Sequence, residues 1–258
     1  MRRAYFVVEG PHEVEVVGRL LRLHALQRMR SVDELDPYWR RLVPRSFPYR
    51  GDLLKRVPVP VFFASNELSV AVQSAGGISR LLATVDSAMN NVDSPLDGIG
   101  VVLDADDSAV ERRWASVATK LPVADAGAGP GRVSESKPRA GVYVLPDNER
   151  TGTLEHLLLA CAERAYPSLL QSARAWIEPL DPHDRSVFST AKEREDLAKP
   201  SGKTKAIVAS IASVLRPGKS IQVSIQDNQW LRHPEALAVQ DVLALRAFVA
   251  GILGTDDG

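Results

Sequence analysis

The sequence predicts an α/β fold in which a mostly parallel sheet is flanked by helices and followed by a helical C-terminal part. Two observations predict it. Short apolar runs alternate with segments whose apolar residues recur at helical spacing, as in strands joined by helical crossovers. In addition, Ala4–Val8 leads directly into Glu9, and Gly98–Leu103 leads directly into Asp104. In open α/β sheets the carboxyl ends of strands are where functional groups gather.

The N-terminal half contains three of the predicted strands. Ala4–Val8 is the first, and a stripe of Val and Leu predicts a helix over Glu13–Leu26. Segment 27–67 is rich in Arg, Pro and Tyr and is interpreted as a loop-rich insertion. The second strand is predicted over Leu68–Gln73 with a helix over 78–88, and the third over Gly98–Leu103 with a helix over 108–120.

The C-terminal half contains the fourth strand and most of the helices. After a loop rich in Ala, Gly and Pro at 125–139, the fourth strand is predicted over Gly141–Leu145. A helix over Thr153–Ala165 follows, capped by Thr151 or Thr153. Further helices are predicted over 186–198, 203–215 and 235–253. We therefore expect a domain over 1–178 that contains the sheet, and a mainly helical part over 179–258 packed on the same core.

The composition narrows the function. With 258 residues, 45% of them hydrophobic and 25% charged, the chain is globular rather than disordered or fibrous. Because 32 Lys+Arg balance 32 Asp+Glu, any contact with nucleic acid must be local. Cys161 is the single cysteine and lies in an apolar helical stretch, which indicates core packing and a cytoplasmic location. No stretch approaches the ~20 apolar residues of a membrane span, and the N-terminus does not resemble a signal peptide.

Carboxylates follow three of the predicted strands. Glu9 and Glu13 follow the first strand, Asp104 and Asp106 the third, and Glu155 opens the helix after the fourth. Acids gathered at one edge of a sheet would repel one another unless a cation neutralised them, and oxygen ligands suit Mg²⁺ or Mn²⁺. Taken singly, acids at helix starts also complement the helix dipole, which is the alternative for Glu13 and Glu155.

At these residues the sequence resembles the Toprim domain family, which carries a Glu after its first strand and Asp-x-Asp after its third. The match is closest to Toprim nucleases of the OLD type, whose Glu-Gly-Pro-x-Glu motif is matched by Glu9-Gly10-Pro11-His12-Glu13 and whose Leu-Glu motif is matched by Leu154-Glu155. Small standalone bacterial Toprim-like proteins are similar as well. The resemblance implies Glu9, Glu13, Asp104, Asp106 and Glu155 as metal ligands, and Glu9, Asp104, Asp106 and Lys205 as catalytic residues.

The resemblance has departures. OLD proteins carry an ATPase domain, which this sequence lacks: Gly202-Lys203-Thr204 looks like the end of a P-loop, but Leu197 stands where the earlier glycine is needed. The implied function is a divalent-metal-dependent nuclease acting on DNA or RNA in phage defence or nucleic-acid turnover. A non-enzymatic nucleic-acid or protein-binding module and a primase-like polymerase are the alternatives. The sequence leaves open whether an activating protein partner is needed and whether the protein forms a homo-oligomer.

Three further features of the sequence bear on nucleic-acid contact or catalysis. Lys203 and Lys205 both open an amphipathic helix, either as cations near a scissile phosphate or as solvated surface lysines. Arg40, Arg41, Arg45 and Arg50, interleaved with Trp39, Phe47 and Tyr49, resemble a loop that contacts nucleic acid. A structured insertion or an oligomer contact is the favoured interpretation of that loop. His12, inside the first motif, is interpreted as a variable loop residue rather than a proton shuttle.

Overall fold

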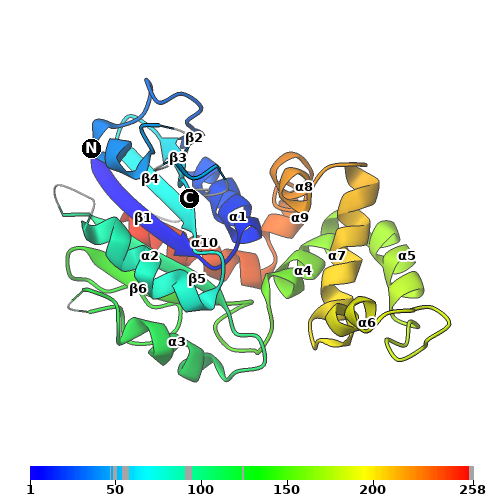
Figure 1. Ribbon diagram of the computed structural model, residues 1–258. Coiled ribbons are helices and arrows are strands. Elements are labelled where there is room, and N and C mark those ends of the chain that lie inside the picture. The colour runs from blue at the N-terminus through cyan, green and yellow to red at the C-terminus, as the bar shows by residue number, and fades with distance from the viewer. Residues whose placement is uncertain (47, 49–50, 54–57, 91–94, 124, 256–258) are drawn as a thin grey trace. The chain divides into compact units, whose positions relative to one another are not determined.

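The structure is a computed structural model that describes the chain except for residues 47, 49–50, 54–57, 91–94, 124 and 256–258 (Figure 1). Its contacts divide the chain into two compact units. Unit 1 comprises residues 1–103, 111–144 and 245–258, and unit 2 comprises residues 104–110 and 145–244. These units interleave along the chain and do not coincide with the expected segments 1–178 and 179–258.

A six-stranded sheet with the order β2-β3-β4-β1-β5-β6 forms the core of unit 1. The strands are β1 (Arg2–Val8), β2 (Gln27–Arg28), β3 (Val61–Ala64), β4 (Leu68–Ser74), β5 (Gly98–Asp104) and β6 (Arg139–Leu145). β1 pairs in parallel with both β4 and β5, and Val8 lies opposite Val102. The mostly parallel sheet predicted from the sequence is therefore confirmed, and so are its four predicted strands.

One edge of the sheet was not predicted. β3 pairs antiparallel with both β2 and β4, so the segment interpreted as a loop-rich insertion adds two strands to the sheet. Only four residues long and preceded by Pro58 and Pro60, β3 gives a weak strand pattern. Trp39 in the 3₁₀ helix η1 (Pro37–Leu42) is fully buried, and its indole N–H donates to Ser69 Oγ at 2.7 Å.

The burial of Trp39 makes it a core residue of unit 1 rather than a platform for stacking bases. At Trp39, the interpretation of segment 27–67 as a structured insertion is therefore supported. Phe47, Tyr49 and Arg50 lie outside the described residues.

Helices pack on this sheet through close backbone approaches. α1 (Pro11–Leu23) packs against β3 and β4, and α2 (Ile78–Asn90) packs against β1 (Figure 1). A Cβ atom at Gly18 would meet the Phe63 ring, and one at Gly98 would meet the carbonyl oxygen of Ile252. These two glycines therefore let α1 and the end of α10 (Gln240–Leu253) lie close to the strands. α3 (Val110–Ala118) completes the helices of this part of the chain.

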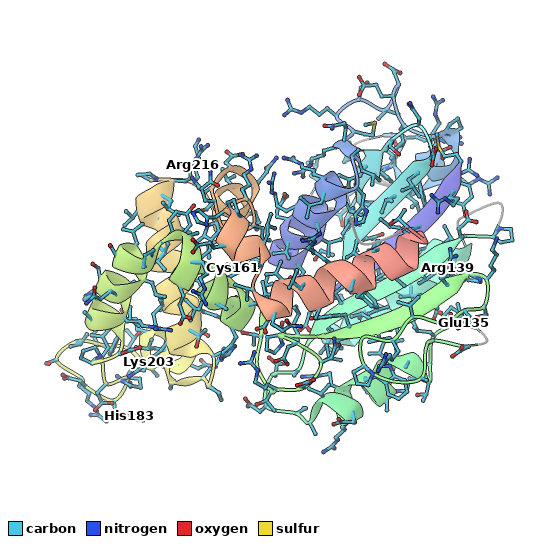
Figure 2. All side chains as sticks on the ribbon, turned by 180° about the vertical axis from the view of Figure 1, so that it is seen from behind. Glu135, Arg139, Cys161, His183, Lys203 and Arg216 are labelled. Carbon is cyan, nitrogen blue, oxygen red and sulfur yellow. The ribbon has the colours of Figure 1, made fainter. Side chains whose placement is uncertain are left out.

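Unit 2 is helical, with α7 (Gly202–Leu215) at its centre. α7 contacts α4 (Leu154–Ala165), α5 (Pro167–Ile177), α6 (Ala191–Ala198) and α8 (Ile221–Asp227), while α9 (Pro234–Leu237) packs on α4. Its core includes Val208, Ile211 and Cys161, and Cys161 is labelled on α4 in Figure 2. The expected helix over 235–253 is two helices, α9 and α10. Within the described residues, no helix has the length and apolar character needed to cross a membrane.

Candidate functional site

Glu9 and Glu13 lie in unit 1, where glycine and proline shape the turn between them. The Glu9 backbone N–H donates to the Val102 carbonyl at 3.1 Å, so Glu9 continues the pairing of β1 with β5. Gly10 is the N-cap of α1, and Pro11 begins the helix. A Cβ atom at Gly10 would lie 2.9 Å from Glu13 Oε2. The buried Glu13 side chain folds back over Gly10, where the absence of a Cβ leaves room for its carboxylate.

Asp104 is the last residue of β5 and is only 8% exposed. Its Oδ1 accepts the backbone N–H of Leu154, the first residue of α4, at 2.8 Å. The first N–H groups of a helix have no partner within the helix, and a carboxylate there also complements the helix dipole. Asp104 therefore fixes the start of α4 within unit 2, a structural role that the sequence did not reveal.

Asp106 and Gly152 pair their backbones in the same unit. Each donates its N–H to the other's carbonyl, at 2.8 and 2.9 Å. Both have positive φ, 51° at Asp106 and 142° at Gly152, and the latter value is one that L side chains rarely adopt. This pairing connects the segment after β5 to the loop before α4, and it brings the Asp-x-Asp motif beside the Gly152-Thr153-Leu154-Glu155 segment.

The first turn of α4 carries Glu155 and His156. Glu155 is 7% exposed, and its Oε2 accepts the hydroxyl of Thr153 at 2.8 Å. Thr153 is the N-cap, as one of the two sequence alternatives predicted, and its backbone N–H donates to His156 Nδ1 at 3.0 Å. His156 thus takes the place that Glu or Gln has in an ordinary capping box.

A polar cavity of about 510 Å³ opens in unit 2 beside these residues. Its lining comes from both loops and from the start of α7: Asp106, Asp107, Thr151, Gly152, Thr153, His156, Lys199, Pro200, Ser201 and Lys205. The structure therefore brings together Asp106 and Lys205, two residues selected from the sequence. His156 and Lys199 were missed, although the Thr-x-x-His spacing at the start of α4 was a usable signal.

Only one of the two candidate lysines lines this cavity. Lys205 lines it, whereas the ammonium of Lys203, labelled in Figure 2, donates to the Glu178 carbonyl at 2.7 Å. α7 follows helix α6, and a Cβ at Gly202 would meet the carbonyl oxygens of Asp196 and Leu197. Gly202 therefore allows α6 and α7 to approach each other closely. The strand-to-helix turn of a P-loop is not present here, as the absence of the earlier glycine at position 197 indicated.

An ion-pair network holds the loop before α4. Arg150 pairs with Asp147 at 2.5 Å and with Asp241 at 2.9 Å. Burial raises the pKa of Asp147, but hydrogen bonds from the backbone and side chain of Arg150 outweigh burial and leave that pKa below its usual value. The pKa of Asp241 is raised, mainly by burial and also by the Asp147 charge, which together exceed the opposing effect of Arg150.

The acids of the candidate site suit a hard divalent cation in the chemistry of their donor atoms. Carboxylate oxygens are the ligands that Mg²⁺ and Mn²⁺ prefer, and Asp104, Asp106 and Glu155 supply them within unit 2. Yet among the residues that the structure describes, no three His, Cys, Asp or Glu side chains are grouped so that they could hold a metal ion. These three residues offer the kind of oxygen ligand that the ion prefers. That they gather around one ion together with Glu9 and Glu13 stays a prediction.

The fold and site define an α/β protein with acids following neighbouring parallel strands and a polar cavity in a helical unit. The chain matches the family described as a protein of unknown function (DUF3226) over residues 3–247, and it belongs to that family. A solved structure, that of the hypothetical protein PH0156 from Pyrococcus horikoshii OT3, shares 14% sequence identity with a TM-score of 0.56. The alignment covers 97% of this chain and 100% of that one, which shows a shared fold. Among curated proteins there is no significant match.

Proposed function

We propose that the protein is a divalent-metal-dependent nuclease that hydrolyses nucleic-acid phosphodiesters. The observation that carries the proposal is the cavity of unit 2, whose lining includes both Asp106 and Lys205. A carboxylate and an ammonium on one cavity suit a phosphodiester, because the ammonium can stabilise the negative charge that develops on the phosphate. The other acids that the Toprim resemblance selects follow strand ends or open a helix.

The chain's own residues supply orientation and charge. Asp104, Asp106 and Glu155 would hold a cation in unit 2, and Glu9 and Glu13 are the predicted ligands from unit 1. A bound Mg²⁺ or Mn²⁺ would polarise the phosphate and activate water. Thr153 orients the Glu155 carboxylate, and Leu154 orients that of Asp104. Lys205 would contact the phosphate from the start of α7.

The test is cleavage of DNA and RNA oligonucleotides with and without Mg²⁺ or Mn²⁺. We expect Lys205→Met to reduce the cleavage rate by about 10²-fold or more, the size of effect seen when one charge-stabilising donor is lost. Lys203→Met is the matched control, because Lys203 lies two residues away on the same helix and its ammonium donates to a backbone carbonyl.

A second comparison addresses the acids. Asp106→Asn should abolish metal-dependent cleavage, whereas Asp107→Asn, which alters a neighbouring carboxylate of the same cavity outside the Asp-x-Asp motif, should retain most of it. Equal cleavage by wild type, Asp106→Asn and Lys205→Met would refute the assignment.

The second candidate is a non-enzymatic module that binds nucleic acid or a protein. The specific observation in its favour is that the described side chains group no three metal-ligating residues. Calorimetry with Mg²⁺ and Mn²⁺ separates the two candidates: a nuclease of the proposed kind binds the ion and loses that binding in Asp104→Asn, whereas a binding module shows no ion binding and no cleavage.

A further inference from the structure

The ring of His156 is held by the backbone at the start of α4. In the described part of the chain, Nδ1 of the ring accepts the Thr153 backbone N–H at 3.0 Å. Thr153 Oγ1 also lies 3.3 Å from Nδ1, but its hydroxyl proton is donated to Glu155 Oε2. A nitrogen that accepts a hydrogen bond from a backbone N–H carries no proton itself. The neutral ring therefore carries its proton on Nε2, which makes Nε2 a donor.

Gly152 permits this placement of the ring. A Cβ atom at Gly152 would lie 3.0 Å from Nδ1 and 3.3 Å from Cε1 of His156. The edge of the ring with Nδ1 is therefore packed against the backbone of residues 152 and 153. His156 is exposed and lines the cavity of unit 2, so the edge available to a ligand is the one that carries Nε2–H.

The charges around this cavity point to the class of ligand. The lining holds Asp106 and Asp107 together with Lys199 and Lys205. Lys199 forms an ion pair with Asp196. The Lys205 charge also helps to lower the pKa of the Asp196 carboxyl, but the Lys205 ammonium makes no hydrogen bond or ion pair among the described residues. A neutral imidazole N–H and an ammonium are both donors, and a phosphate group offers several acceptor oxygens in a tetrahedral arrangement that two separate donors can share.

We propose that His156 donates from Nε2 to a phosphate oxygen of a ligand bound in the cavity of unit 2, beside Lys205. This inference rests on the proposed function and deepens it, because it adds a phosphate-contacting residue that the sequence motifs do not include. Nδ1 fixes the ring by accepting the Thr153 N–H, and Nε2 contacts the ligand. A single side chain thus caps α4 and binds the phosphate.

The experiment measures binding of inorganic phosphate to the full chain at neutral pH, without metal and without nucleic acid, from the NMR shifts of the backbone amides of residues that line the cavity; where His156 is present, its ring shifts are a second readout. Three substitutions separate the two tasks of the side chain. His156→Gln keeps an acceptor for the cap and an N–H donor, His156→Glu keeps the acceptor and removes the donor, and His156→Ala removes both. Thr151→Glu is the electrostatic control, because it adds the same charge to the lining away from the cap.

We expect phosphate to shift the His156 resonances in the wild type, and His156→Gln to bind within about threefold of it. His156→Glu should bind at least about tenfold more weakly than Thr151→Glu, since a hydrogen bond to a charged group is lost. Hydrogen exchange in α4 should stay unchanged in the Gln and Glu variants and become faster in His156→Ala. Wild-type shifts without saturation, or equal losses in His156→Glu and Thr151→Glu, would overturn the proposal.

The two proposals fail in different ways. Saturable phosphate binding that depends on His156, in a protein that cuts no nucleic acid under any metal condition, supports this inference and refutes only the nuclease. Metal-dependent cleavage with unchanged rate in His156→Glu, and no phosphate-dependent shift at His156, refutes this inference and leaves the nuclease standing.

Discussion

The hydrogen bond from Leu154 N–H to Asp104 Oδ1 predicts that Asp104 stabilises the start of α4 independently of any catalytic role. Replacing it by Asn removes the charge and keeps an oxygen acceptor of the same shape, whereas replacing it by Ala removes both. Comparing the two variants with each other cancels the effect of the charge, including its repulsion from nearby acids. What remains is the hydrogen bond to a nearly buried site.

The magnitude follows from leaving a helix-terminal N–H without its acceptor. A buried donor that loses its partner costs about 1–3 kcal/mol. We therefore expect Asp104→Ala to be less stable than Asp104→Asn by about 1–2 kcal/mol. Because about 1.4 kcal/mol is a factor of ten in an equilibrium constant, the Leu154 amide should exchange with solvent roughly tenfold faster in the Ala variant.

The assay is urea unfolding of both variants, followed by hydrogen exchange at the Leu154 amide. Equal unfolding free energies and equal Leu154 exchange in Asp104→Ala and Asp104→Asn would refute the anchoring role. If the role holds, Asp104→Asn is the variant to use in cleavage assays, because it removes a proposed metal ligand while the start of α4 stays in place.

Three further predictions concern unit 2. Arg150→Met should destabilise the protein by only about 1 kcal/mol at pH 7, because the Arg150 side chain is 62% exposed and solvent screens its ion pairs. The lowered pKa of Asp147 means that its contribution is present above its unfolded pKa of about 3.9 and is lost as the pH falls through the folded value. The difference between Arg150→Met and wild type in unfolding free energy should therefore shrink below about pH 4, and a pH-independent difference would contradict this. Gly152→Ala should cost about 1–3 kcal/mol in urea unfolding, because φ is 142° there; a loss under 0.5 kcal/mol would show that the loop adapts. Burial raises the pKa of the Cys161 thiol to about 12, so a thiol reagent at pH 8 should label it only after unfolding, and rapid labelling of the native protein would contradict its buried position.

Two residues that line the cavity, Asp106 and Lys205, could be selected from the sequence, because the motifs that carry them are short and local. Glu9-Gly10-Pro11-His12-Glu13 lies between a predicted strand and a predicted helix, and the structure has β1 before it and α1 beginning at Pro11. By contrast, the roles of Asp104 and His156 depend on residues in other segments or on the geometry of a helix end. A periodicity in the sequence carries no information about which backbone N–H a side chain will accept.

The sequence by itself determined the parallel core strands, because strands buried on both faces are nearly continuous apolar runs whose ends are marked by charge or glycine. It also determined where the carboxylates stand relative to those strands. Only the tertiary structure decided that Trp39 is buried, that Val61–Ala64 pairs as a strand, and that Lys205 rather than Lys203 lines a cavity. The physical reason is that burial, sheet pairing and the environment of an ammonium arise from contacts between segments distant in the chain. Strand and helix patterns, by contrast, depend on residues that are neighbours in the sequence.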